Sequence, residues 1–526
     1  MNSLQFIKKL YNGKNCYSDS LTEDEIALLH IPSGVERIVE EMVDTNRIIF
    51  LTGNPGDGKT YIIRALEAKL VQKDVYIEKD MNSVTDDKTS DVINKIAECY
   101  HHNKSCIIAA NEFPFFKLIR ASKALAPELH NELINVKKNI IFYGYSTLQL
   151  RRICIIDLNE RNLLDKDRSV IPPIVSKFVE LLKDSTGVNS VLDYNVEALQ
   201  SKLVIDQLMR LFNLVAMSGE HFAIRDILGT LAYAITACTV DDEDINGFYY
   251  DALFSGDNEL MSFIAQFDPI LLSKPSLDEQ LWNGEKTDGW LMGAPNKWPR
   301  ELTDESVEEA TELFKSIKRK FYFENIYAKE LSELQPVDYT DCERIFVSLG
   351  SSRNKRGILN MLINSMNRLF LSTDDEKERL RIWTSHSFDL SREAGAAVST
   401  KYIDVADLDL VYPEPISWLN DMEFTPDHLV MKLKRDNTSS RLEIDVMLLR
   451  GLISIKNGYP ASLLSGQYEQ AISQFTQALA ATTAARDYGG GELLIANRRE
   501  GSRKRIYIED NKYSFHDGGD FEWHVK

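Results

Sequence analysis

One motif of eight residues constrains the fold of this chain more than any other part of the sequence. It reads Gly53-Asn54-Pro55-Gly56-Asp57-Gly58-Lys59-Thr60 and fits the phosphate-binding pattern G-x-x-x-x-G-K-[ST] at every fixed position. The apolar residues 47–52 before it are typical of a buried parallel strand, and residues 61–70 after it are typical of a helix. Because strand, glycine loop and helix is the order that this motif requires, the sequence predicts a nucleoside triphosphate site.

The residue types explain how such a loop would hold a polyphosphate. Glycines let the backbone wrap closely round the anion, so that successive N–H groups and the positive end of the following helix face it. Lys59 is predicted to reach the β- and γ-phosphates, and the Thr60 hydroxyl is predicted to complete the shell of a Mg²⁺ ion. Tyr61, the first residue after the motif, joins the loop as a predicted contact. The cofactors expected are therefore ATP and Mg²⁺.

Length and composition indicate a multidomain globular protein. The 526 residues exceed what one core organises, and 44% hydrophobic with 27% charged residues is ordinary for a globular chain. We expect a helical lead-in (1–45), a P-loop NTPase core (46–170), a helical lid (171–260), a linking region with a basic-aromatic stretch (261–350) and a mixed C-terminal interaction module (351–526). No segment approaches the roughly 18 uninterrupted apolar residues of a membrane span, and the N-terminus has no signal-peptide layout. These features predict a cytoplasmic protein with no membrane partner.

The cysteines and histidines give no sign of a metal site or a disulfide framework. The six cysteines lie far apart without a C-x-x-C pair: Cys16, Cys99, Cys106, Cys154, Cys238 and Cys342. We expect reduced, mostly buried thiols. The one histidine cluster, His101-His102, is expected in a solvated turn.

Charge argues against a protein that coats nucleic acid nonspecifically. The formal net charge is −19, whereas such binding needs an excess of Lys and Arg on the contacting face. Two local basic segments remain candidates, residues 315–323 and residues 498–505. The first interleaves cations with aromatic residues, as single-strand binders do. For each segment we favour the alternative, a helix end or loop whose cations point to water.

Alternation of apolar strands and helix-like stretches from residue 46 to about 157 predicts an α/β fold with a parallel sheet covered on both faces. The predicted strands are residues 48–52, 75–78, 106–110, 139–143 and 153–158. Ligands of such sheets bind at the carboxyl ends of the strands. Helical periodicity then continues from about residue 171 to 239.

Hydrolysis also needs an acidic residue near Mg²⁺ and a group that orients or deprotonates water. Residues 107–112 have the shape of a Walker B strand, but Asn111 stands where an Asp is usual. In the interpretation that we favour, Glu112 activates water and Asn111 binds Mg²⁺ weakly or through water. In the alternative, Asn111 is a sensor near the γ-phosphate and Asp80 takes the acidic role. A strand that simply ends in a turn would explain the same residues without any chemistry.

Arginines could also contact a γ-phosphate. Arg161 follows the last predicted strand, and Arg225 opens a helix in the predicted lid. A helical subdomain that carries an arginine after the sheet resembles the lid of AAA+-type ATPases. The doublet Arg151-Arg152 is a third candidate, and an ordinary salt bridge is the alternative for each.

Several segments together resemble one family. They are Val35-Glu36-Arg37, the glycine motif, Lys79-Asp80-Met81-Asn82-Ser83 and Ala109-Ala110-Asn111-Glu112, with looser matches at residues 222–228, 267–269 and 318–323. This set, within residues 20–330, is similar to the DptF-type NTPase of phosphorothioation-dependent DNA restriction systems. Only the phosphate-binding loop is specific by itself, and Glu112 departs from the family pattern.

The resemblance implies an ATPase subunit of a bacterial anti-phage defence complex that works with helicase-like and nuclease partners on foreign DNA. The sequence leaves open whether DNA is contacted directly and whether copies of the chain assemble. No nuclease signature was found, since residues 78–80 and 509–512 lack the required spacing. The expected fold class is an AAA+/STAND-like P-loop NTPase with a helical lid. The competing function is a STAND-like nucleotide-gated scaffold that hydrolyses little.

The last third of the chain is expected to mix strands and helices. Residues 357–364 have helical periodicity, residues 405–412 and 429–433 are typical of strands, and residues 444–455 and 468–479 are typical of amphipathic helices. Residues 506–509 and 512–515 flank a turn pair and predict a hairpin.

Overall fold

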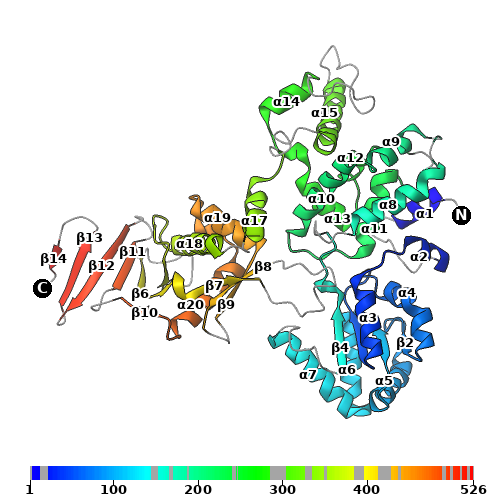
Figure 1. Ribbon diagram of the computed structural model, residues 1–526. Helices are drawn as coiled ribbons and strands as arrows, with labels where there is room; N and C mark the ends of the chain where they lie inside the picture. The colour runs from blue at the N-terminus through cyan, green and yellow to red at the C-terminus, as the bar shows by residue number, and fades with distance from the viewer. Residues whose placement is uncertain are drawn as a thin grey trace. The chain divides into compact units, whose positions relative to one another are not determined.

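The computed structural model divides the chain into two compact units (Figure 1). One comprises Met1–Pro336 with Glu414–Thr425, and the other comprises Val337–Pro413 with Pro426–Lys526. The structure describes residues 3–11, 22–143, 152–164, 170–185, 187, 189–239, 245, 247–284, 304–325, 334–348, 352–383, 396–412, 428–435, 440–488, 493–497, 502–509, 512–517 and 522–524.

A four-stranded parallel sheet forms the centre of the first unit, in the order β2-β3-β1-β4. Its strands are β1 (Ile48–Thr52), β2 (Tyr76–Glu78), β3 (Cys106–Ala109) and β4 (Ile153–Asp157). These confirm four of the five predicted strands and the α/β class with a parallel sheet. In register, Phe50 of β1 lies between Ile108 of β3 and Ile155 of β4. The glycine loop therefore leaves the sheet from an interior strand.

Both faces of the sheet are buried, because its apolar residues alternate between two cores. Phe50, Ile108 and Ile155 pack in one core with α5 (Asp86–His101), α6 (Glu112–Leu125) and α7 (Pro127–Tyr143). Their neighbours Ile49 and Ile107 pack in the other core with α3 (Gly34–Asp44) and α4 (Lys59–Gln72). The continuous apolar strands of the sequence are thus explained by helices on both sides.

The predicted strand at residues 139–143 is wrong, since these residues end helix α7. Leu129, Leu133 and Val136 are all buried, and their spacing of four and three residues is helical. The apolar run at 139–143 continues that helical pattern. Its five residues considered alone could not be distinguished from a short strand.

A helical subdomain follows the sheet and confirms the helical periodicity expected between residues 171 and 239. It contains α8 (Ile171–Leu182), α9 (Ser190–Ala198), α10 (Lys202–Ala216) and α11 (Ile224–Thr236). The N-terminal helix α1 (Ser3–Leu10) packs on α8 and α11, as Figure 1 shows. Helix α2 (Glu23–Leu29) begins with a capping box, in which Thr22 N donates to Glu25 Oε2 at 2.7 Å and Glu25 N donates to Thr22 Oγ1.

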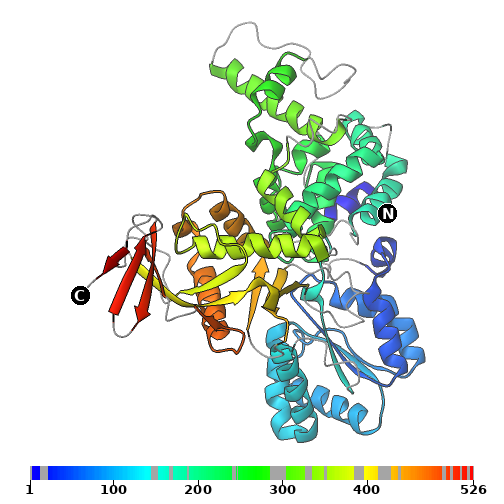
Figure 2. The same ribbon diagram turned by 60° about the vertical axis from the view of Figure 1, so that its left-hand side comes forward.

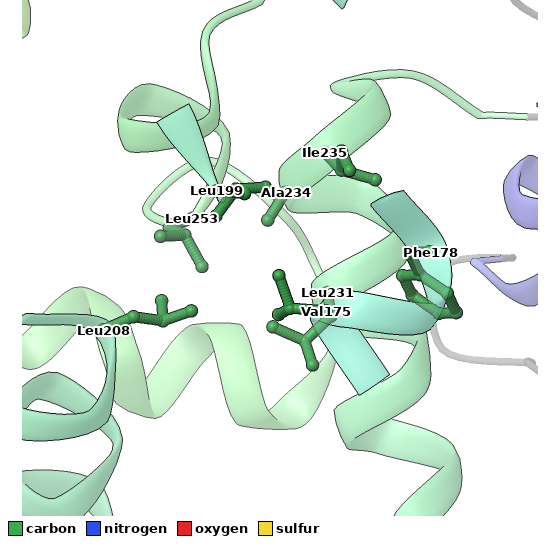
Figure 3. Close-up of a pocket in the computed structure, with 8 residues that line it drawn as sticks. All are labelled: Val175, Phe178, Leu199, Leu208, Leu231, Ala234, Ile235 and Leu253. Carbon is green, nitrogen blue, oxygen red and sulfur yellow. The ribbon is translucent and has the colours of Figure 1, made fainter. Parts of the chain in front are cut away.

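The core of this subdomain encloses a small cavity of about 10 Å³ (Figure 3). Its lining consists of apolar side chains from several segments: Val175, Phe178, Leu199, Leu208, Leu231, Ala234, Ile235 and Leu253. A cavity of this size without polar groups has room for at most one water and nothing to hold it. It is a packing defect of the helical core and no ligand site.

The basic-aromatic segment 315–323 lies in α15 (Asp304–Glu324), where both interpretations of the sequence are wrong at its centre. Lys318 and Lys320 are buried rather than solvated, and Lys318 Nζ forms an ion pair with Asp278 at 2.7 Å. Arg319 donates to Asp268 at 2.6 Å and to Asp251 at 3.1 Å. These cations are held within the protein and offer no surface to nucleic acid. Of the second basic segment, residues 498–501 lie outside the described residues, and 502–505 belong to strand β12.

The second unit mixes antiparallel sheets with helices. A seven-stranded sheet has the order β10-β6-β11-β12-β13-β14, with β5 (Arg379–Trp383) paired to β6 (Ala396–Asp404). The remaining strands are β10 (Arg486–Asp487), β11 (Leu493–Asn497), β12 (Ser502–Glu509), β13 (Lys512–Asp517) and β14 (Glu522–His524). Figure 2 shows β12 to β14 in red, side by side at the edge of this sheet. The antiparallel pairing of β12 with β13 confirms the predicted hairpin.

A second, three-stranded sheet joins β7 (Leu408–Val411), β8 (His428–Leu433) and β9 (Arg441–Asp445). The helices of this unit include α17 (Val337–Ser348), α18 (Ser352–Arg368), α19 (Val446–Lys456) and α20 (Gly466–Ala480). The predicted mixture of helices and strands is therefore present. None of the helices in the described ranges of the whole chain combines the length and hydropathy needed to cross a bilayer. Five cysteines are buried free thiols, as expected, and Cys16 lies outside the described residues.

Candidate nucleotide-binding site

The glycine loop connects the end of β1 to the start of α4, and its backbone conformation explains its glycines. Gly53, Gly56 and Gly58 have φ angles of +137°, +100° and +88°, values that residues with a Cβ rarely adopt. Close neighbours add a second constraint: a Cβ on Gly53 would lie 2.5 Å from Asp57 Oδ2. Helix α4 begins at Lys59, so its unpaired N–H groups and the positive end of its dipole face the loop. The loop has the backbone that an anion site requires.

Lys59 lies at the centre of this loop. The side chain is largely buried, and Nζ donates to Gly53 O at 3.0 Å and to Asn54 O at 2.6 Å. Burial lowers the pKa of Lys59, and the charges of Asp57, Asp157 and Asp80 oppose that shift. Three carboxylates are therefore close enough to act on this ammonium group.

The segment that follows β2 brings Asp80 close to Thr60. Thr60 Oγ1 donates to Lys79 O at 3.3 Å, and Met81 N donates to Ala109 O at 2.9 Å. The chain after β2 thus crosses the carboxyl end of β3 and reaches the start of α4. Asp80 Oδ1 accepts hydrogen bonds from the backbone and side-chain amides of Asn82. Asp80 consequently lies at the same rim as the loop.

Asn111 and Glu112 lie at that rim too. Ala110 N donates to Leu51 O at 3.0 Å, which places Asn111 beside the end of β1. Asn111 is the N-cap of α6, and Glu112 is an exposed acidic residue in its first turn. Among the described residues, no group of three or more His, Cys, Asp or Glu is gathered to hold a metal ion. A Mg²⁺ ion here would take its remaining ligands from phosphates and water, as Mg²⁺ commonly does.

Asp157 is a candidate site residue that the sequence analysis missed. It ends β4 opposite Thr52 in the register and accepts a hydrogen bond from Asn159 N at 3.1 Å. Burial raises the pKa of the Asp157 carboxyl, and the nearby charges of Asp57 and Glu112 add to that shift. A polar residue that directly ends a buried strand was the available signal, the same signal used for Asn111.

Asp57 links the glycine loop to the helical subdomain. Its side chain is 2% exposed; Oδ2 accepts from Asn54 N at 2.5 Å, and Oδ1 accepts from His221 Nε2 at 2.7 Å. Burial opposes protonation of His221, but its hydrogen bond with Asp57 and the charge of Asp57 outweigh burial, so the His221 pKa is raised. Asn159 Oδ1 also accepts from Asn54 N, at 3.2 Å.

Residues 221–225 lie against the loop, so the structure brings the predicted Arg225 to the predicted site. Arg225 N donates to Gly56 O at 3.3 Å, and a Cβ on Gly56 would lie 3.0 Å from Arg225 Cζ. Ile224 likewise approaches Gly58. The Arg225 guanidinium forms an ion pair with Asp226 at 3.7 Å. The ion pair of the alternative interpretation and the contact with the loop therefore occur together.

The other predicted arginines do not lie together at the glycine loop. Arg161 is buried just after the 3-10 turn Leu158–Glu160, and its charge acts on Glu36 of α3. Arg152 precedes β4 and donates to Cys99 O and Lys104 O at 2.8 and 2.7 Å. That position is the amino end of the strand, opposite the glycine loop, so Arg152 is excluded from the site. Arg151 lies outside the described residues.

Tyr61 anchors the segment before α3. Its hydroxyl lies 2.9 Å from His30 Nδ1 and accepts from Ile31 N at 3.2 Å. Burial raises the pKa of Tyr61 above its ordinary value. Tyr61 therefore connects the first turn of α4 to the chain that leads into the sheet.

The chain matches no protein-family model, no curated protein and no solved structure.

Proposed function

We propose that this chain binds ATP with Mg²⁺ through residues 53–60 and hydrolyses it as a subunit of a bacterial anti-phage defence complex of the DNA-restriction type. The observation that carries the nucleotide site is the glycine loop itself. It leaves an interior parallel strand, three of its glycines have positive φ, and Lys59 opens the following helix. Loops of this kind place backbone N–H groups and a lysine round phosphates.

Each residue at the rim has a definite role in this proposal. When ATP binds, Lys59 Nζ gives up its hydrogen bonds to the carbonyls of Gly53 and Asn54 and donates to phosphate oxygens. Thr60 contributes its hydroxyl to the Mg²⁺ shell. Bound ATP with Mg²⁺ would supply the phosphoanhydride bond. Glu112 orients a water molecule and accepts its proton on a carboxylate oxygen. Asp80 and Asp157 are the alternative carboxylates for that role.

The defence role, its helicase-like and nuclease partners and the action on DNA rest on the sequence resemblance. The second candidate function is a nucleotide-gated scaffold with little hydrolysis. The bond between Asp57 and His221 favours it, because nucleotide binding at the loop would act directly on the helical subdomain. Asn111 in place of a Walker B aspartate also favours weak hydrolysis.

The test is nucleotide binding and hydrolysis by the purified chain with Lys59→Ala, alone and with single-stranded or duplex DNA. Lys69→Ala is the matched control, since Lys69 is exposed on the same helix and pairs with Glu40. We expect Lys59→Ala to lose ATP binding and the control to keep it. Unchanged ATP affinity in Lys59→Ala would refute the site. Tight binding without turnover, with or without DNA, would select the scaffold function.

A further inference from the structure

Two aromatic side chains are exposed on helix α6, beside the candidate nucleotide site. Phe113 is 77% exposed and Phe116 is 47% exposed. They are three residues apart and therefore neighbours on one helical face. Phe115, which lies between them in the sequence, is buried against the sheet. The exposure of Phe113 and Phe116 is therefore confined to the outer face of the helix. Exposed large apolar groups beside one another mark binding surfaces.

Cations surround these rings. Lys117, Arg120 and Lys123 are exposed on the same helix, against one acidic residue, Glu112 in the first turn. Lys137 of α7 lies with Nζ 5.1 Å from the centre of the Phe116 ring. This local excess of positive charge contrasts with the net charge of −19 for the chain. This face is therefore complementary in charge to a polyanion.

A pocket of about 360 Å³ adjoins the Phe113 ring. Phe113 and Lys117 line it from α6, Thr89 lines it from α5, and Asn82 and Asn111 line it from the ends of β2 and β3. Its size falls within the range of small-ligand pockets, roughly 300–1,000 Å³. Amide, hydroxyl and ammonium groups beside an aromatic ring can bind the polar edge and the flat face of an unpaired base.

We propose that this face of α6 and its pocket bind single-stranded nucleic acid. Bases stack on Phe113 and Phe116, one base enters the pocket, and Lys117, Arg120 and Lys123 contact the phosphates. A duplex keeps its bases stacked inside and cannot use the exposed rings in this way. The site differs from both basic segments singled out in the sequence.

The position of the pocket connects this site to the nucleotide. Asn111 lines the pocket and also lies at the rim of the glycine loop. The inference deepens the proposed function. Only the link between the α6 site and the nucleotide site rests on that function. Binding of nucleic acid to α6 requires no ATP and no hydrolysis.

The experiment measures fluorescence anisotropy of a labelled oligothymidine of about 15 nucleotides, a length near the largest site sizes of such proteins. The full chain is titrated without nucleotide, and a duplex of the same length is compared. Variants are Phe113→Ala and the double substitution Lys117→Ala with Arg120→Ala. The matched control replaces exposed Lys69 and Val71 of α4 by alanine. Melting temperatures verify that each variant is folded.

We expect Phe113→Ala to weaken binding about 5- to 150-fold, the effect of losing one stacked base. The double substitution should reduce the slope of log affinity against log salt by roughly 1.4, which corresponds to two phosphate contacts on a single strand. The control should bind as the unchanged protein does. Equal affinity of Phe113→Ala and control, preference for duplex, or no binding by the unchanged chain would overturn the proposal. Self-association that Phe113→Ala abolishes, without oligonucleotide binding, would assign the face to contacts between copies.

ATP binding distinguishes the two failures. If Lys59→Ala loses ATP binding while the oligonucleotide does not bind, only the α6 site is wrong. If the oligonucleotide binds and Lys59→Ala retains ATP binding, the nucleotide proposal is wrong and the α6 site stands.

Discussion

The hydrogen bond between Asp57 and His221 should hold the glycine loop closed onto the helical subdomain. His221→Ala removes the hydrogen-bond donor of Asp57 Oδ1, and this carboxylate is almost fully buried. Oδ2 keeps the backbone N–H of Asn54. A hydrogen bond to a charged group contributes about 1.5–3 kcal/mol, so we take ~2 kcal/mol for local opening of the loop. Since 1.36 kcal/mol is a factor of ten, loop amides should exchange about 30-fold faster.

The effect should depend on pH with a defined sign. The folded pKa of His221 is raised, so the protonated ring binds Asp57 more strongly than the neutral ring does. The stabilisation is complete below the unfolded pKa, about 6.5, and the charged part is lost as pH rises through the folded value. The difference between the unchanged chain and His221→Ala should therefore be largest near pH 6 and smaller at pH 9.

Hydrogen exchange followed by mass spectrometry measures this directly for peptides that cover residues 52–60, after correction for the intrinsic exchange rate at each pH. His101→Ala is the control, because His101 is an exposed histidine whose charged neighbour is Glu128. Equal protection of the loop in His221→Ala and His101→Ala would refute the reasoning. A difference that grows with pH would refute the role of the protonated ring.

Three further predictions concern single carboxylates. Glu112→Gln should retain ATP binding and lower turnover at least about 100-fold, as measured by phosphate release; unchanged turnover would move the role to Asp80 or Asp157. Asp157→Asn should raise the melting temperature at pH 7 but much less near pH 4, because the raised pKa of Asp157 means that its ionisation in the folded state costs stability as pH rises; a lower melting temperature at pH 7 would contradict this. Asp374→Ala in the second unit should lower the free energy of unfolding by about 3 kcal/mol in calorimetry, since it removes the carboxylate that binds buried Arg381 at 2.7 Å and leaves only Glu376, at 3.9 Å, as an acidic partner in the described part of the chain; a change below ~1 kcal/mol would show that the pair contributes little.

The elements that could be predicted from sequence were those whose pattern is local. Strand, glycine loop and helix around residue 53 needed only a run of apolar residues and a motif, and the hairpin of β12 and β13 needed a turn between two short strands. The strand predicted at residues 139–143 failed because five apolar residues fit either a strand or the end of a helix. Only its packing in α7, on the side of the sheet opposite to α4, distinguishes the two.

Which side chains are buried and which are exposed could not be predicted from the local pattern. Lys318 and Lys320 have the sequence of a solvated basic face, yet both are buried: Lys318 pairs with Asp278 of a distant segment, and Lys320 pairs with Glu324 one turn along α15. Phe113 is the converse: an apolar residue type that would be expected in the core is exposed.

The sequence by itself determined that a glycine loop with a lysine opens a helix after a buried strand, because that geometry depends on neighbouring residues alone. It also placed Asp80, Asn111 and Glu112 at strand ends. The same signal was present at Asp157. Only the tertiary structure decided that Arg152 lies at the opposite end of the strands from the glycine loop and that His221 reaches Asp57 from 164 residues away. Contacts between distant segments depend on how helices and strands pack, and the local pattern of residues does not encode that packing.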